Sequence, residues 1–358
     1  MKIITRYFYR EFFTFFLLSL ITFLITYLVI EFFGKIDNFL GAQVPLNVVL
    51  SYFIYQIPFV IQQMTPIAVL ISAMLMLGIM NKHNEILALK NAGQSLFNLA
   101  YPLITISILI GIGSFFLSES FVPITNSRAN HIWNVEVKKR RPRGAYKLSH
   151  LWYRGKDSIY QIRTYDSRKK TIEGLTIFFF DRDFRLRKRI DAKRATWIKG
   201  RWYLTDGLSQ TIEDDGSRKL IRFKSHTVQL PETPENFERT MKSPEEMSFW
   251  ELRHYTRRIR EEGYDSTRSE VELNTKMAFP FISLVLVLVG IPLAFRKKRG
   301  GIPLSITIAI GVSFLYLLTF GLSRSLALSG ALPPILGAWL ANLLFSLFGI
   351  CLILSVES

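Results

Sequence analysis

The chain is a series of long apolar runs interrupted by one long polar segment. The apolar runs carry almost no charge and are Phe12–Ile30, Pro58–Met80, Asn98–Ser118, Met277–Phe295, Ile302–Leu322 and Ile335–Val356. A helix needs roughly 20 residues to cross a hydrocarbon core about 30 Å thick, and lipid offers no partner for backbone N–H and C=O groups. The pattern therefore predicts an α-helical membrane protein with six transmembrane helices and a large insertion between the third and the fourth.

The insertion has the pattern of short β-strands. From about Tyr146 to Leu230 it contains segments such as SIYQIRTYD and KLIRFKSHTVQL, which are rich in Ile, Thr, Tyr and Phe and are separated by glycine or acidic turns. This pattern is typical of an antiparallel sandwich or jellyroll. We expect an all-β jellyroll domain over residues 120–245. It is either an ordinary structural sandwich or one whose open apolar interior holds a lipid.

An amphipathic helix is predicted between the insertion and the fourth span. Ser243 and Glu246 have the spacing of a capping box, in which each side chain accepts a hydrogen bond from the backbone N–H of the other residue. Ser248 and Glu251 offer a second start of the same kind. Gly263 is a suitable end, because glycine readily adopts the left-handed conformation that often follows a helix.

Charge is separated along the chain and between the loops. The 358 residues have a formal net charge of +17, and residues 120–271 hold 33 of the 45 Lys and Arg and 21 of the 28 Asp and Glu. The short loops on one side of the membrane hold nine basic residues, and those on the other side hold only Lys35 and Arg324. Since basic short loops stay in the cytoplasm, we expect both termini and residues 81–95 there and the β-domain outside.

The sequence lacks the motifs of several functional classes. It has no G-x-x-x-x-G-K-[ST] loop for nucleotides, no H-E-x-x-H and no G-x-S-x-G, and its five histidines are scattered. No nucleic-acid-binding motif is visible, and the single Cys351 lies in the last apolar run. We therefore expect no catalytic residues, no metal and no cofactor in this chain. Any transport would draw its energy from a partner.

Residues 81–95, NKHNEILALKNAGQS, form a short polar stretch between the second and third spans. On a helical wheel, one continuous arc holds small or apolar residues and a single carboxylate: Glu85, Ile86, Ala88, Leu89, Ala92 and Gly93. Small residues permit the close approach of another protein, and a carboxylate can pair with an arginine there. We interpret the arc as a docking face for a cytoplasmic partner, and an ordinary loop helix is the alternative.

Several segments, taken together, resemble one family. They are KIITRYFYREF, EFFGKIDNFL, NEILALKNAG, GLTIFFFDRDFRLRKRIDA, MSFWELRHYTRRIREEGYDSTRSEVELNTKMAFP and ALPPILGAW, in this order along almost the whole chain. No single segment is specific. The ordered set, with a β-domain between the third and fourth spans, resembles the LptF/LptG family of lipopolysaccharide-export permeases. The helix before the fourth span and the two prolines of the last segment look more like LptG than LptF.

The resemblance implies an ABC transporter permease, multi-pass in the bacterial inner membrane, with a periplasmic jellyroll domain. Its partners would be the LptB ATPase dimer, which binds the ATP, the other permease subunit LptF, LptC, and LptA through the periplasmic bridge. The substrate would be lipopolysaccharide on its way to the outer membrane, with no role for nucleic acid. Residues 1–119 would hold three spans and the coupling helix 81–95, residues 120–245 the jellyroll, and residues 246–358 a periplasmic connecting helix and three more spans.

Three basic residues lie at the expected height of the lipid headgroups. They are Lys35 beyond the first span, Arg128 past the third and Lys276 before the fourth. By the resemblance, we expect them to contact phosphate or acidic sugar groups of the substrate. Basic side chains also extend to the interface at any helix end without binding substrate, which is the alternative. Two other functions stay open: a sensor or scaffold whose β-domain recognises a ligand, and a membrane enzyme acting on lipid headgroups.

Overall fold

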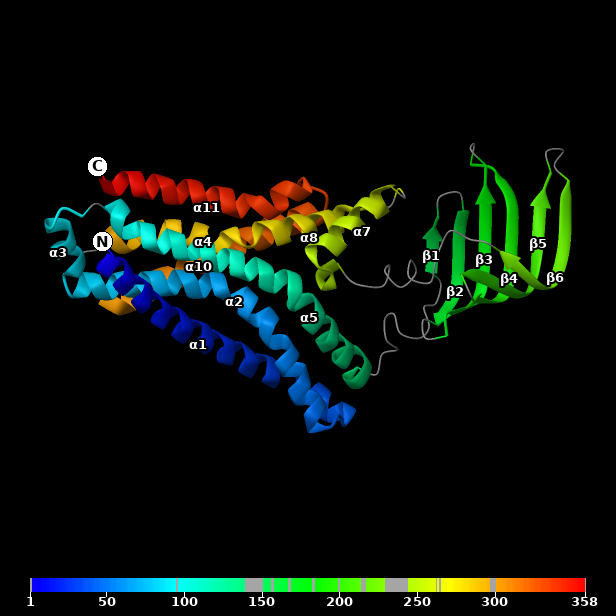
Figure 1. Cartoon of the computed structure of the whole chain (residues 1–358), viewed down its shortest axis with the longest axis horizontal. Coiled ribbons are helices and arrows are strands. Elements are labelled where there is room, and N and C mark those ends of the chain that lie inside the picture. The colour runs from blue at the N-terminus through cyan, green and yellow to red at the C-terminus, as the bar shows by residue number, and fades with distance from the viewer. Residues whose placement is uncertain are drawn as a thin grey trace. The chain divides into compact units, whose positions relative to one another are not determined.

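The computed structural model describes residues 2–94, 96–138, 151–155, 158–166, 169–181, 184–198, 200–213, 217–228, 244–261, 263, 265–296 and 301–357. Ser243, where one helix start was expected, lies outside them. The chain divides into two compact units. The helical unit comprises Met1–Ala129, Pro244–Arg257 and Asp265–Ser358, and the β unit comprises Asn130–Ser243 and Arg258–Tyr264. Figure 1 shows the bundled helices of the first unit and the sheet of the second.

Long apolar helices make up most of the helical unit. The helices among the described residues are α1 (Lys2–Ala42), α2 (Leu46–Lys82), α3 (Glu85–Asn91), α4 (Leu96–Ser120), α5 (Val122–His131), α7 (Phe249–Glu261), α8 (Thr267–Ala278), α9 (Phe281–Arg296), α10 (Gly301–Leu328) and α11 (Pro334–Glu357), with a π-helix at Ile132–Val137 and a 3₁₀-helix at Pro244–Glu246. Within the described part of the chain, α1, α2, α4, α10 and α11 are each long and apolar enough to cross a membrane. The pair α8 and α9 meets the same test as one span bent by 53°. The predicted helical membrane architecture is therefore confirmed.

The fourth crossing is broken at Pro280. Proline has no backbone N–H and its ring clashes with the preceding turn, so a helix that reaches it loses hydrogen bonds. The carbonyl of Ala278 accepts a hydrogen bond from the Asn342 amide of α11 (3.0 Å). The Asn342 oxygen accepts one from the Tyr316 hydroxyl of α10 (2.6 Å), and both side chains are buried. The predicted span, Met277–Phe295, contains this bend, which the apolar pattern does not reveal.

Glycines bring the spans into close contact. A Cβ atom built on Gly111 of α4 would lie 2.5 Å from the carbonyl oxygen of Pro280. One built on Gly349 of α11 would lie 3.0 Å from the backbone of Leu288 in α9. Lipid tails are as apolar as the side chains of a span, so helices in a membrane associate through close packing rather than through the exclusion of water. These two contacts hold α4 and α11 against the broken fourth crossing.

The capping box predicted at the start of α7 is present. The N–H of Ser248 donates to the Glu251 carboxylate (3.2 Å), and the N–H of Glu251 donates to the Ser248 hydroxyl (3.3 Å). A carboxylate at the end of the third span, Glu119, accepts a further bond from the N–H of Phe249 (2.6 Å). Gly263, beyond the end of the helix, has a left-handed φ of +76°, as its predicted role requires. The start of α7 is therefore tied to the helical unit.

The β unit contains one antiparallel sheet. Its strands are β1 (Leu151–Arg154), β2 (Ser158–Asp166), β3 (Thr171–Phe180), β4 (Leu186–Ile198), β5 (Arg201–Ile212) and β6 (Arg218–Val228), paired in the order β1-β2-β3-β4-β5-β6. The antiparallel strands predicted between about Tyr146 and Leu230 are thus confirmed, whereas residues 122–137, which were expected in the same all-β domain, are helical. Each described strand pairs with the next one along the chain, because short turns join antiparallel neighbours. The result is a meander, whereas a jellyroll of Greek keys needs longer connections between strands that are not neighbours.

One face of the sheet is apolar and buried, and the other is polar. Inward side chains such as Ile162 and Leu175 are at most 1% exposed. The alternation of faces is interrupted at one level, where each strand from β2 to β6 has one residue outside the backbone pairing: Arg163, Gly174, Lys193, Asp206 and Lys224. Gly174 (φ +66°) and Asp206 (φ +54°) have left-handed backbone there. The strands therefore bend along a common line, which we call the crease.

Gly111→Ala should destabilise the helical unit, because the added methyl group collides with backbone that cannot move aside. We expect a loss of about 1–3 kcal/mol, the usual cost of overpacking. Gly113→Ala, two residues along the same helix with nothing within 4 Å of its Cβ position, is the matched control. The measurement is the midpoint of thermal unfolding of the chain in detergent. Equal midpoints for the two variants would contradict the close packing of α4.

Candidate functional site

Helix α3 forms a short elbow between α2 and α4. Figure 1 shows it at the same end of the helical unit as both chain termini. The chain enters α3 through Asn84, whose φ of +58° is left-handed, and leaves it through Gly93 (φ +79°). The N–H of Gly93 bonds the carbonyl of Lys90 (2.9 Å), and the N–H of Gln94 bonds that of Leu89 (3.0 Å). These bonds form a Schellman motif. Its residue beyond the helix end has a left-handed backbone, which glycine adopts without steric cost.

The elbow helix is shorter than the stretch predicted for it. It covers Glu85–Asn91, whereas the sequence pattern suggested residues 81–95. Asn81 and Lys82 continue α2, and Ser95 lies outside the described residues. A helix of two turns makes few internal hydrogen bonds, so its stability depends on contacts with its neighbours.

Two side chains of the predicted docking arc hold α3 against the spans. Ile86 is 5% exposed, and Leu89 packs against the buried core of the helical unit. The small residues of the arc, Ala88, Ala92 and Gly93, are exposed. The arc is therefore divided into an anchoring part and an exposed part, a division that a helical wheel alone cannot make.

Leu87 joins the exposed part, although it was not among the residues of the predicted arc. Its side chain is 55% exposed, next to Ala88. An exposed apolar side chain among small residues can enter a pocket of a protein partner. The signal in the sequence was a bulky apolar residue on the side that faces away from Ile86. We call Leu87, Ala88, Asn91 and Ala92 the elbow face.

Polar contacts join α3 to two further helices. The hydroxyl of Tyr7 in α1 donates a hydrogen bond to the Glu85 carboxylate (3.1 Å). The Lys90 ammonium lies 5.9 Å from the centre of the Phe295 ring in α9, at the outer limit of a cation–π contact. A displacement of α3 would therefore act on α1 and α9 as well as on α2 and α4, to which it is covalently joined.

Lys35 lies in a polar cluster between α1 and α2. Its ammonium pairs with the Glu31 carboxylate one turn earlier and donates a hydrogen bond to the Tyr52 hydroxyl. Tyr52 is 1% exposed, and its hydroxyl also accepts a bond from the Gln56 amide (2.8 Å). The charge of Lys35 is therefore already balanced within the protein.

Arg128, in α5, contacts the same stretch of α2. Its Nη1 donates to the Tyr55 hydroxyl (3.2 Å), and its guanidinium lies 5.5 Å from the centre of the Tyr55 ring. Tyr52 and Tyr55 are three residues apart, so they occupy neighbouring positions on one side of α2. The structure thus brings Lys35 and Arg128 to adjacent tyrosines. Sequence reasoning missed both tyrosines, whose only signal was two hydroxyl groups at helical spacing ahead of an apolar run.

Lys276 belongs to a different cluster. It lies one turn after Glu272 in α8, and the carboxylates of Glu272 and Glu119 act electrostatically on it. Glu272 is bound by Arg324 of α10 (2.6 Å). The three cations predicted to bind substrate therefore form two groups, one beside α2 and one on α8.

The groups around Lys35 and Arg128 have the chemistry of binding sites for anions. In the part of the chain that the structure describes, no three His, Cys, Asp or Glu side chains gather where they could hold a metal ion. A cation held by a tyrosine hydroxyl can exchange that neutral partner for a phosphate oxygen, which accepts a stronger, charge-assisted hydrogen bond. The groups around Lys35 and Arg128 are therefore suited to anionic headgroups.

Tyr52→Phe should destabilise the helical unit, because it removes the hydroxyl that the buried Gln56 amide and Lys35 share. We expect a loss of about 1–3 kcal/mol, the cost of leaving a buried polar group unsatisfied. Tyr55→Phe removes only a bond to the exposed Arg128, and should change the midpoint of thermal unfolding in detergent little. A Tyr52→Phe midpoint equal to that of Tyr55→Phe would contradict a buried cluster around Lys35.

Comparison with known proteins bears on the family of this chain. A sequence profile described as "Lipopolysaccharide export system permease LptF/LptG" matches residues 6–355. The lipopolysaccharide export system permease protein LptG of Haemophilus influenzae is 25% identical over 304 residues, which cover 81% of this chain and 80% of the relative. The protein of the same name from Escherichia coli K12 is 22% identical over 324 residues, which cover 85% and 84% of the two chains. The chain belongs to the LptF/LptG family of lipopolysaccharide export system permeases.

Proposed function

We propose that this chain is one of two permease subunits of an ATP-driven exporter, which extracts lipopolysaccharide from the bacterial inner membrane and passes it to a periplasmic bridge. As a permease, the chain is not itself an enzyme. The observation that carries the proposal is the elbow α3. It exposes small residues, is anchored by apolar side chains, and contacts two further helices. An element built in this way can transmit motion from a soluble partner to the spans.

The soluble partner in this proposal is the LptB ATPase dimer, which binds and hydrolyses the ATP. The elbow face enters a groove of one ATPase subunit, and Glu85 exchanges the Tyr7 hydroxyl for an arginine of the partner. A charged pair is stronger than the hydrogen bond that it replaces. Because Tyr7 lies in α1, docking also releases the inner end of the first span.

The second permease subunit in this proposal is LptF, and the β unit passes the substrate on to LptC and LptA. Only 11% of the apolar stretch of α1 is buried within this chain, against 72% of that of α2. The apolar surface of α1 is therefore available to another subunit and to the acyl chains of a lipid. We assign α1 as one wall of the passage through which the lipid enters.

Lys35, Arg128 and Lys276 contact phosphates or acidic sugars of the headgroup in this proposal. At Lys35 the headgroup replaces Glu31, and at Arg128 the guanidinium offers two parallel donors to one phosphate. On α8, an incoming anion competes for the Lys276 ammonium with the carboxylates of Glu119 and Glu272, and Arg324 already holds Glu272 (2.6 Å). Two groups of cations can thus hold a headgroup that carries more than one anionic group.

Ala88→Trp should weaken association with the ATPase, because a large side chain on the elbow face prevents close approach. We expect roughly tenfold less ATPase to copurify in detergent, which corresponds to about 1.4 kcal/mol of binding free energy. Glu85→Arg, which reverses the carboxylate beside this face, should act in the same direction. The matched control is Ala331→Trp, the same change at an exposed alanine between α10 and α11. Equal copurification with the Ala88 and Ala331 variants would remove the elbow face from the interface.

Lys35→Asp combined with Lys276→Asp should lower photo-crosslinking of lipopolysaccharide to benzoylphenylalanine placed in α1, because two cations that attract phosphate become anions. We expect a loss of about tenfold at limiting lipid. Reversal of Lys169 and Lys219, two exposed lysines of the β unit, changes the net charge equally and serves as the control. If the two double variants crosslink alike, Lys35 and Lys276 only extend to the interface.

A further inference from the structure

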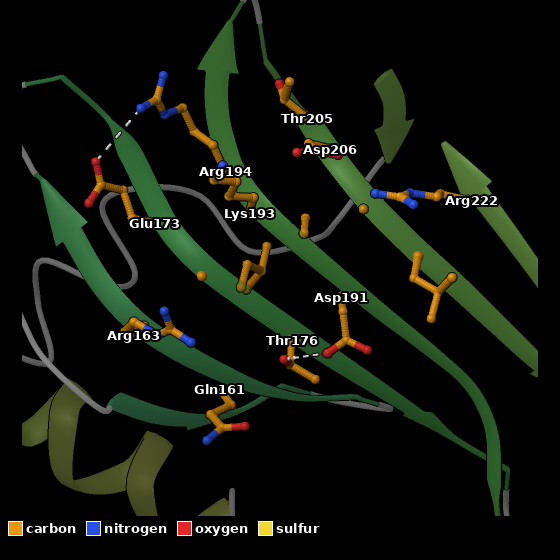
Figure 2. Close-up of a pocket in the computed structure, with 15 residues that line it drawn as sticks. Gln161, Arg163, Glu173, Thr176, Asp191, Lys193, Arg194, Thr205, Asp206 and Arg222 are labelled. Atoms are coloured by element: carbon orange, nitrogen blue, oxygen red, sulfur yellow. Dashed lines mark hydrogen bonds and ion pairs between the residues drawn. The ribbon is translucent and has the colours of Figure 1, made fainter. Parts of the chain in front are cut away.

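We propose that the polar face of the β unit carries a binding site for an anionic saccharide. The site is an open cavity of about 1100 Å³ along the crease (Figure 2). The choice of saccharide rests on the proposed function, in which the cargo is a glycolipid with a phosphorylated sugar headgroup. The site itself rests on four observations: the shape of the sheet, its hydrogen-bonding groups, its charge and an exposed aromatic side chain.

The crease gives the polar face its hollow. Side chains alternate between the two faces of a regular strand, so one residue separates two neighbours on the same face. In β3, however, two residues separate the buried side chains of Ile172 and Leu175. The same spacing separates Ala192 and Ala195 in β4. The extra residue interrupts the alternation in neighbouring strands at the same level without shifting their register, and residues from both sides of this level line one cavity.

The cavity presents hydrogen-bonding groups in a fixed arrangement. The Thr176 hydroxyl donates to the Asp191 carboxylate (2.7 Å), which also pairs with Arg189 (2.9 Å). Gln161 and Thr205 line the same cavity from β2 and β5. Figure 2 shows these lining side chains on neighbouring strands around a common space. Carboxylate and amide groups that are held in place can accept from and donate to adjacent hydroxyls of a sugar ring.

The lining contains more cations than anions. Four basic and three acidic side chains face the cavity. Arg194 and Glu173 lie 3.9 Å apart and balance each other. Arg163, Lys193 and Arg222 extend from three different strands and are exposed. Cations that surround a hollow raise the local concentration of ligands with phosphate or carboxylate groups and can hydrogen-bond to them.

An aromatic side chain is the cross-strand neighbour of Gln161, which lines the cavity. Trp152 of β1 is 55% exposed and lies parallel to Phe178, with ring centres 6.1 Å apart and an angle of 11°. Arg189 in turn lies over the Phe178 ring at 5.5 Å. Trp152 is paired with Gln161 in the β1–β2 register, so both side chains project from the polar face. An indole that is exposed and fixed by a second ring offers a flat apolar surface to the C–H face of a sugar.

These features together favour a saccharide over other ligands. A protein partner would need an interface core of large apolar side chains, and ten of the fifteen residues that line this cavity are polar or charged. An inorganic anion would use the cations but not the indole of Trp152. A phosphorylated sugar uses all of these groups: the indole for its ring, the fixed polar groups for its hydroxyls and the cations for its phosphates.

The test is a calorimetric titration of the full-length chain in nanodiscs, without ATP. The probe is lipid-free core oligosaccharide, released from lipopolysaccharide by mild acid. Trp152→Ala and Arg222→Glu should each weaken binding about tenfold, the effect of losing one good stacking or charged contact. Lys219→Glu makes a matched charge change on the same strand, outside the cavity lining, and should bind as the unaltered chain does. Oligosaccharide stripped of its phosphates should also bind more weakly.

Two results would overturn the proposal. One is that Trp152→Ala and Arg222→Glu bind the oligosaccharide as tightly as Lys219→Glu does. The other is that inorganic phosphate displaces the oligosaccharide at equal concentration, which would make the cavity a phosphate site. Neither result bears on the proposed function, which is tested by ATPase copurification with the Ala88→Trp variant. Conversely, a chain that binds no ATPase can still be titrated with the oligosaccharide.

Discussion

Backbone carbonyls inside a lipid bilayer need partners, because the hydrocarbon core contains no water to bind them. The break between α8 and α9 shows how this requirement organises the helical unit. Pro280 interrupts the fourth crossing, and the carbonyl of Ala278 is bound by Asn342 from α11. The oxygen of Asn342 is bound in turn by Tyr316 from α10. The close approach of Gly111 to the carbonyl of Pro280 brings α4 to the same place. Three further helices, α4, α10 and α11, thus meet at one interrupted turn between α8 and α9.

Much of this architecture could be predicted, because length and charge alone decide whether a segment can cross a bilayer. The start of the fourth crossing could not, since α8 carries charged residues such as Glu272 and Lys276 and so does not resemble a span. Alternation along the strands predicted the all-β insertion. It could not predict the strand order or the crease, because both depend on the register among several strands and not on any one of them.

At the elbow and at the cation groups, too, the sequence shows which side chains are present but not which neighbours they contact. The acid, the small residues and the final glycine of α3 were visible in the sequence. The side of α3 that faces the spans was not, and only the structure shows that Ile86 and Leu89 pack inward while Leu87 is exposed. The tyrosines that bind Lys35 and Arg128 come from another helix, and their spacing in the sequence does not show which cations they contact. The functional roles of the elbow face and of these cations stay predictions.

The ion pair between Lys35 and Glu31 has a consequence for the choice of cargo. Glu31 is tethered one helical turn from Lys35, so a lipid that binds Lys35 must compete with a carboxylate held at high effective concentration. A headgroup with a single weak charge competes poorly against this resident anion. A headgroup that engages Lys35 and Arg128 at the same moment gains from multivalency, since its second contact is intramolecular. Under the proposed role of Lys35 and Arg128, this competition favours a polyanionic glycolipid over a phospholipid with a single charge.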